Sequence, residues 1–158
     1  MFVLARAVTY AALFIGFVLV FLPARILSSA GIIQPPTIGA AQVAGVLLGG
    51  AGAALALTCI FTFAVIGRGT PAPFDPPRRL VVRGPYRRIR NPMYAGAGLA
   101  LAGAAVYYQS TGLLAYAAAF LLLMQAFVVL YEEPTLRRTF GNEYEAYCRQ
   151  AGRWWPTR

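Results

Sequence analysis

The stretch that decides the fold runs from residue 93 to residue 131, MYAGAGLALAGAAVYYQSTGLLAYAAAFLLLMQAFVVLY. It contains no charged residue, and polar side chains gather only near its middle, at Gln109–Thr111. Two apolar runs joined by so short a polar segment predict a tight antiparallel helical hairpin. Each run approaches the roughly 20 apolar residues that a transmembrane helix needs. We therefore expect spans at Met93–Tyr108 and Gly112–Tyr131, the first of them near the short limit.

Two further uncharged apolar blocks precede this hairpin. The first, Ala7–Leu22, lies between Arg6 and Arg25, and the second, Ile38–Ile66, is long enough to cross a core of about 30 Å with tilt. The prolines between the blocks exclude a continuous helix. Hydrophobic residues make up 59% of the chain. The sequence thus predicts an all-α polytopic membrane protein with about four transmembrane helices.

Two features of these blocks have alternative interpretations. The first block also resembles a signal peptide, with Ser28, Ser29 and Ala30 imitating a cleavage site, but we prefer a retained span. In the second block, Gly45 and Gly49 are followed by more glycines, and small residues let helix backbones approach closely in lipid. We expect these glycines to pack within the chain rather than to form a dimer.

The charge is concentrated in two polar segments. The net charge is +9, from fourteen arginines, no lysine and five acids. The loop Arg68–Pro92 is rich in proline and carries Arg68, Arg78, Arg79, Arg83, Arg87, Arg88 and Arg90, and the tail carries Arg137, Arg138, Arg149, Arg153 and Arg158. With four spans, loop and tail lie on one side of the bilayer, where the positive-inside rule places them and both termini in the cytoplasm. We expect an integral protein of a prokaryotic inner (plasma) membrane that contacts anionic lipids, not nucleic acid.

The tail beyond the fourth span is patterned. Leu136, Phe140, Tyr144 and Tyr147 recur at helical spacing and predict an amphipathic C-terminal helix. We divide the chain into an N-terminal pair of transmembrane helices, residues 1–67, and a catalytic core, residues 68–158. No metal site is expected, because the chain has no histidine and its two cysteines lack metal-ligand spacing.

Two short motifs at the predicted membrane boundary are candidates for chemistry. Asn91 is a good N-cap and Pro92 suits the first helical position, so with Arg90 the start of the third span is an anion site or an ordinary cap. Glu132 and Glu133 end the fourth span, and Glu132 lies seven residues after Gln125, so we expect the two to share a helix face. This doublet is either an ion-paired boundary or a carboxylate that binds the hydroxyls or an amine of a ligand.

These motifs resemble those of a known family. The segment Arg90-Asn91-Pro92-Met93-Tyr94-Ala95-Gly96 is similar to the Arg-His-Pro-x-Tyr-x-Gly motif of isoprenylcysteine carboxyl methyltransferases and related phospholipid methyltransferases. Glu132-Glu133-Pro134-Thr135-Leu136 resembles their Glu-Glu-x-x-Leu motif, and Phe140–Tyr147 and Arg153–Pro156 resemble their C-terminal pattern. The resemblance covers about Pro71 to Pro156. It departs at Asn91, where the family has a histidine.

The resemblance implies an integral-membrane methyltransferase that uses S-adenosylmethionine on a lipophilic or lipidated substrate. It implies a cofactor held between the two motifs, with Arg90 and Glu132 in catalytic roles. The cofactor-binding candidates are Tyr86, Asn91, Pro92, Tyr94, Gly96, Tyr131, Glu132 and Glu133. Tyr86, Tyr94 and Tyr131 are also suited to cation–π contact with a sulfonium.

The residue types favour a carboxylate as methyl acceptor. A carboxylate is ionised at neutral pH and needs no general base, and an arginine can orient it through two hydrogen bonds. Two other functions stay open. A sterol-type membrane reductase has a similar Gly-x-x-Tyr-x-x-Tyr pattern, and Arg87, Arg88 and Arg90 would then hold the extra phosphate of NADPH. A helical membrane scaffold without enzymatic activity is the other alternative.

Overall fold

A computed structural model describes residues 9, 12–32, 37–62 and 80–157. Within these residues the regular structure is helical, and the only strand-like feature is a single bridge between Ile89 and Gly152. The helical elements, in chain order, are η1 (Ile15–Phe21), α2 (Leu22–Ser29), α3 (Ala40–Thr62), η3 (Gly84–Arg87), α4 (Pro92–Tyr108), α5 (Thr111–Phe127), η4 (Val128–Glu132), α6 (Glu133–Phe140) and α7 (Asn142–Gln150). The predicted all-α fold is confirmed.

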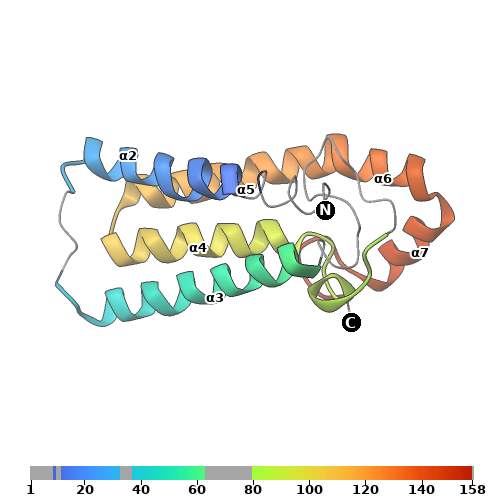
Figure 1. Ribbon diagram of the computed structural model, residues 1–158, viewed down its shortest axis with the longest axis horizontal. Helices are drawn as coiled ribbons and strands as arrows, with labels where there is room; N and C mark the ends of the chain where they lie inside the picture. Colours follow the sequence, from blue (N-terminus) through green and yellow to red (C-terminus); the bar gives the residue numbers. More distant parts are fainter. Residues whose placement is uncertain (1–8, 10–11, 33–36, 63–79, 158) are drawn as a thin grey trace.

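The long helices lie side by side, with α4 between α3 and α5, and with α2 packed on α5 (Figure 1). Three stretches of the described residues are long and apolar enough to cross a membrane: Ala12–Ser29, Ala40–Thr62 and Thr111–Phe140. The central helix α4, with 17 residues, would measure about 26 Å at 1.5 Å per residue. The architecture is therefore that of a membrane protein, with α4 close to the short limit expected from its sequence.

Small residues form the contact between α3 and α4. A Cβ atom added to Gly52 would lie 2.5 Å from the backbone nitrogen of Ala100, and one added to Gly96 would lie 2.8 Å from the nitrogen of Ala56. Gly45 and Gly103 meet the partner backbone in the same way. Larger side chains of α3 are exposed on its other faces, among them Val43, Val46, Leu47, Leu57 and Phe61. Gly45 and Gly52 therefore pack within the chain, as expected, whereas Gly50 is exposed.

Two spans extend further than the sequence indicated. The first helical stretch was expected to end at Leu22 but runs to Ser29, and the last was expected to end at Tyr131 but runs to Phe140. In each, a π-helical segment, η1 or η4, ends two residues before a proline, Pro23 or Pro134. A proline ring clashes with the carbonyl four residues earlier, and a wider turn relieves that clash. The prolines therefore do not end these helices.

The hairpin between α4 and α5 forms as predicted. Gln109 ends α4 in the left-handed conformation, with φ of 50°. The hydroxyl of Ser110 then accepts a hydrogen bond from the backbone nitrogen of Leu113 and caps the start of α5. The polar residues that interrupt the apolar run are thus the turn itself.

The C-terminal tail is helical, but as two helices rather than one. Gly141 has φ of 50° and separates α6 from α7, because this conformation interrupts a regular helix. The predicted apolar stripe is still buried: Tyr144 and Tyr147 form a cluster with Ala151, and Leu136 and Phe140 pack against it. Of the loop Arg68–Pro92, the described part contains the short helix η3; residues 68–79 lie outside the described residues.

Candidate active site

The polar loop and the polar tail meet at one end of the helix layer, as the sequence predicted. The hydroxyl of Tyr147, on α7, donates a hydrogen bond of 2.7 Å to the carbonyl of Tyr86 in η3. The backbone nitrogen of Arg90 donates one of 2.8 Å to the carbonyl of Gly152. Both candidate motifs therefore lie at the same end of the molecule, next to α6 and α7 (Figure 1).

The start of α4 differs from the expected cap. Asn91 occupies the N-cap position and Pro92 is the first helical residue, but the Asn91 side chain makes no capping hydrogen bond. Its amide Nδ2 instead donates to the carbonyl of Arg153 at 3.2 Å. This contact requires a hydrogen-bond donor but no titrating proton, which an asparagine amide satisfies.

The two glutamates of the doublet point to different neighbours. Glu132 accepts a hydrogen bond of 3.2 Å from the hydroxyl of Tyr94 on α4. In the part of the chain that the structure describes, no arginine lies within ion-pair distance of Glu132. Tyr86 lies nearby, and burial raises the pKa of its phenol well above the usual range, with smaller contributions from Cys59 and from the charge of Glu132. Glu132, Tyr94 and Tyr86 therefore form one cluster, in which Tyr86 is buried and the other two residues are half-buried.

Glu133, by contrast, is neutralised by two arginines. Its Oε1 lies 3.2 Å from Nη1 of Arg90 and 2.7 Å from Nε of Arg153, and its Oε2 accepts from Nη2 of Arg153 at 3.0 Å. The Glu133 side chain is 5% exposed. The two-pronged hydrogen bond with Glu133 holds the pKa of Arg153 above its usual range. Glu133 is thus the centre of an ion-pair network that joins α6 to the loop and the tail.

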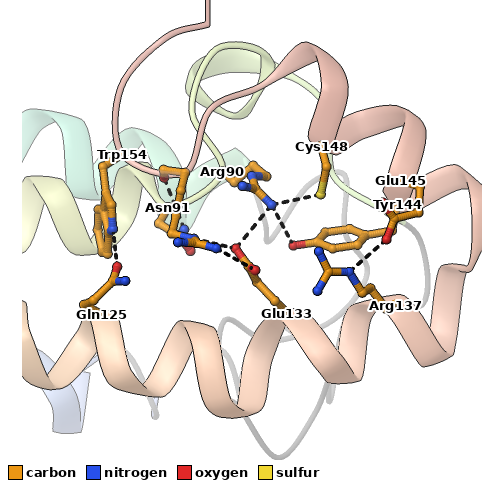
Figure 2. Close-up of polar contacts among 10 residues, drawn as sticks. Arg90, Asn91, Gln125, Glu133, Arg137, Tyr144, Glu145, Cys148 and Trp154 are labelled. Atoms are coloured by element: carbon orange, nitrogen blue, oxygen red, sulfur yellow. Dashed lines mark hydrogen bonds and ion pairs between the residues drawn. The ribbon is translucent and has the colours of Figure 1, made fainter.

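Arg90 makes further contacts from the same network (Figure 2). Its Nη1 donates to the hydroxyl of Tyr144 at 3.4 Å and to the sulfur of Cys148 at 2.8 Å. Its Nε is buried and has no hydrogen-bond partner among the described residues. A buried donor without a partner is uncommon in native proteins.

Two of the residues that the sequence predicted for the site lie apart from the cluster of Glu132, Tyr94 and Tyr86. Tyr131 is 47% exposed and stacks on Phe127, with ring centroids 5.3 Å apart. Gly96 is buried in the contact between α3 and α4. For Tyr131 the observed environment fits an interfacial aromatic, and for Gly96 it fits close helix packing.

The structure adds site residues that the sequence reasoning did not select. Arg153 contacts both Glu133 and Asn91, and the indole Nε1 of Trp154 donates to Oε1 of Gln125 on α5 at 2.5 Å (Figure 2). The only signal for these two residues was their place in the Arg153–Pro156 motif. Gln125 is the one strongly polar side chain within the apolar part of α5.

The model of the phospholipid methyltransferase family matches residues 40–143, about two thirds of the chain. The chain belongs to the phospholipid methyltransferase family. No curated protein and no solved structure matched it. Membership in the phospholipid methyltransferase family makes this protein a membrane methyltransferase.

The phospholipid methyltransferase match extends further toward the N-terminus than the motif resemblance, which began at about Pro71. It includes the whole of α3, which packs closely on α4, and it spans the loop, the hairpin and the glutamate doublet. It ends at Glu143, before Arg153 and Trp154. The family match therefore contains Tyr86, Arg90, Asn91, Tyr94, Glu132 and Glu133.

Proposed function

We propose that this membrane methyltransferase transfers the methyl group of S-adenosylmethionine to a carboxylate of a lipophilic acceptor. The single observation that carries the proposal is the difference between the two glutamates. Glu133 has two arginine partners, whereas Glu132 has only the hydroxyl of Tyr94 among the described residues. Glu132 is half-buried. A carboxylate that is partly removed from water and has no cationic partner is destabilised, and a ligand that brings positive charge or hydroxyl donors reduces that cost.

S-adenosylmethionine fits this environment and supplies an activated methyl group on a positive sulfur. Glu132 can accept hydrogen bonds from its ammonium group or its ribose hydroxyls. The aromatic faces of Tyr86 and Tyr94 suit the sulfonium, with cation–π contacts that contribute about 0.5–2 kcal/mol. Asn91 and Pro92 lie at the start of α4 and would form the wall opposite Glu132.

The acceptor carboxylate follows from the chemistry of the surrounding residues. The chain has no histidine, so a protonated amine would need a glutamate as base, whereas a carboxylate is ready to react. The buried Nε of Arg90 is a donor that such a carboxylate would satisfy. The methyl donor is already activated, so orientation of the two reactants can supply most of the catalysis, worth about 7–11 kcal/mol in well-aligned reactions.

The proposal places the site at the cytoplasmic face of an inner membrane. Exposed arginines surround the site end, among them Arg87, Arg88, Arg138 and Arg149. Arg25 lies on α2, whose Ile26 contacts Gly112 next to the opposite turn. This asymmetry is the one that the positive-inside rule associates with the cytoplasm.

Replacement of Glu132 by glutamine is expected to weaken binding of S-adenosylmethionine by about 10- to 100-fold, because a hydrogen bond to a charged group contributes about 1.5–3 kcal/mol. The measurement is titration calorimetry on detergent-purified protein. Glu143→Gln is the matched control, because Glu143 is exposed on α7. Equal affinities of the two variants would contradict the assigned role of Glu132. Failure of the parent protein to bind S-adenosylmethionine would contradict the proposed cofactor.

The acceptor is expected to enter from the lipid. We expect a carboxylate on a long-chain or prenylated carrier to be methylated much faster than its soluble headgroup alone, because only the carrier partitions into the bilayer beside the site. The measurement compares initial rates of methyl transfer to the two acceptors at equal total concentration in proteoliposomes. Similar rates would argue for entry from water.

A further inference from the structure

The C-terminal segment Gly152–Trp155, called the C-terminal strap here, runs across the start of α4. Gly152 and Ile89 form a parallel bridge, in which Arg90 donates to the carbonyl of Gly152 at 2.8 Å and Gly152 donates to the carbonyl of Arg88 at 3.2 Å. The backbone nitrogen of Asn91 donates to the carbonyl of Arg153 at 3.3 Å. These bonds fix the strap to the loop residue by residue, from Arg88 to Asn91.

The side chains of the strap reach in the other direction, to the helix that carries Glu132. The guanidinium of Arg153 binds both carboxylate oxygens of Glu133, at 2.7 and 3.0 Å. The indole of Trp154 donates to Gln125, two turns earlier on the same continuous helix (Figure 2). The strap is therefore held to the loop by its backbone and to α5 and α6 by its side chains.

The strap also has a local conformation that its sequence enforces. A Cβ atom on Gly152 would overlap the carbonyl oxygen of Trp155, so the chain folds back on itself only with glycine at this position. This turn directs the carbonyl of Arg153 toward Asn91 while its guanidinium extends to Glu133. A single residue thus contacts both motifs at once.

We propose that Arg153 is a positioning residue, which sets the separation between the start of α4, at Asn91 and Tyr94, and Glu132 at the end of η4. The inference rests on the proposed function, because the group that would be positioned is the cofactor. Among the described residues, the side-chain contact that joins Tyr94 to Glu132 directly is one hydrogen bond of 3.2 Å. The strap adds seven hydrogen bonds at the same junction. Three are made by the backbone nitrogens of Arg90, Asn91 and Gly152. The other four are made by the side chains of Asn91, Arg153 (two bonds) and Trp154.

The sequence itself provides a reporter for this segment. The chain has two tryptophans, Trp154 and Trp155, and both lie in the strap. Trp155 is 82% exposed, so Trp155→Phe should leave the contacts of the strap intact and make Trp154 the only tryptophan. Acrylamide quenching of Trp154 then measures whether the strap is docked, and calorimetry with S-adenosylhomocysteine measures the cofactor site in the same sample.

In this Trp155→Phe parent, Arg153→Gln should increase the quenching of Trp154 and weaken S-adenosylhomocysteine binding by at least about tenfold, because small displacements of positioned groups have large effects. Arg153→Lys, which keeps one charged donor, should give intermediate values of both. Arg149→Gln is the control, since Arg149 is exposed on α7, and it should change neither. Helix content by circular dichroism should be the same in all variants.

The outcomes separate the two proposals. A parent that binds no S-adenosylhomocysteine overturns the proposed function. A parent that binds, together with an Arg153→Gln variant that binds equally well, overturns the positioning role alone, whether or not quenching changes. If Arg153→Gln does not fold, Arg153→Lys replaces it: loss of the two-pronged bond to Glu133 should raise quenching and weaken binding, and unchanged binding again overturns the positioning role.

Discussion

Replacement of Glu133 by alanine is expected to lower the free energy of unfolding by about 2–3 kcal/mol, a large effect for one side chain. The carboxylate is 5% exposed and contacts both Arg90 and Arg153. Its removal would leave two arginines close together without a counter-charge. Removal of one partner from a buried ion pair costs about 3–5 kcal/mol. Because Arg153 is partly exposed, we expect a cost at or below the lower limit of that range. Thermal unfolding in detergent measures the change.

The chain contains a suitable control for this substitution. Glu145 makes an ion pair of 2.8 Å with Arg137, but both side chains are about half exposed. Water replaces such a partner readily, so Glu145→Ala should leave the unfolding temperature almost unchanged. Glu133→Gln, which keeps the shape and a hydrogen-bond acceptor, should lie between the two alanine variants. Similar unfolding temperatures for Glu133→Ala and Glu145→Ala would show that the ion-pair network does not stabilise the fold.

Gly52→Leu is expected to prevent the native packing of α3 on α4. Even a Cβ at this position would lie 2.5 Å from the backbone nitrogen of Ala100 and 2.6 Å from the carbonyl of Gly96. These contacts are with backbone, which cannot move aside as a flexible side chain can. Overpacking commonly costs about 1–3 kcal/mol and occasionally more, and a leucine against backbone belongs at the upper end. The measurement is the yield of monodisperse protein on size-exclusion chromatography in detergent, followed by thermal unfolding.

Gly50→Leu is the matched control, on the same helix and two residues away. A Cβ on Gly50 would meet nothing within 4 Å, and the position is exposed. Leucine also has a higher helix propensity than glycine, so this variant should fold at least as well as the parent. If both leucine variants were recovered in equal yield and unfolded at the same temperature, the α3–α4 contact would not have the geometry described above.

Much of the fold could be predicted from local patterns. The uncharged apolar runs predicted the helices, and Gln109–Thr111 predicted the turn between α4 and α5. The glycine spacing indicated that α3 packs within the chain, where its partner is α4. The helix ends were harder, because Pro23 and Pro134 normally end or kink a helix. Here a wider turn before each proline lets the helix continue. No residue pattern in η1 or η4 marks such a turn in advance.

The same wider turn explains why part of the site could not be predicted. In a regular helix Gln125 would share a face with Glu132, as the sequence analysis assumed. The π-helical η4 adds a residue to the turn, and Gln125 instead lies with Glu133, where both contact the C-terminal strap. Glu132 contacts Tyr94. The roles of the two adjacent glutamates therefore depend on a backbone detail rather than on their identity.

Long-range contacts were the other limit. The sequence placed Arg90 and Glu133 in their motifs, but the partner that joins the motifs, Arg153, lies 20 residues after Glu133. Its contact with Asn91 uses a backbone carbonyl, which every residue possesses, so residue type carries no information about it. Only the fold-back at Gly152 brings this carbonyl to the start of α4.

On α3 the small side chains face the neighbouring helix and the large side chains face outward, which is the opposite of the usual arrangement in a water-soluble helix bundle. Its smallest residues touch α4, and its bulkiest ones, such as Leu47 and Phe61, are directed outward, where acyl chains would surround them. Hydrophobicity is nearly uniform around α3, so a hydropathy plot cannot show which face of the helix contacts α4. Side-chain volume does distinguish the two faces. Alignments of similar chains should therefore be searched for positions at which no residue is larger than alanine.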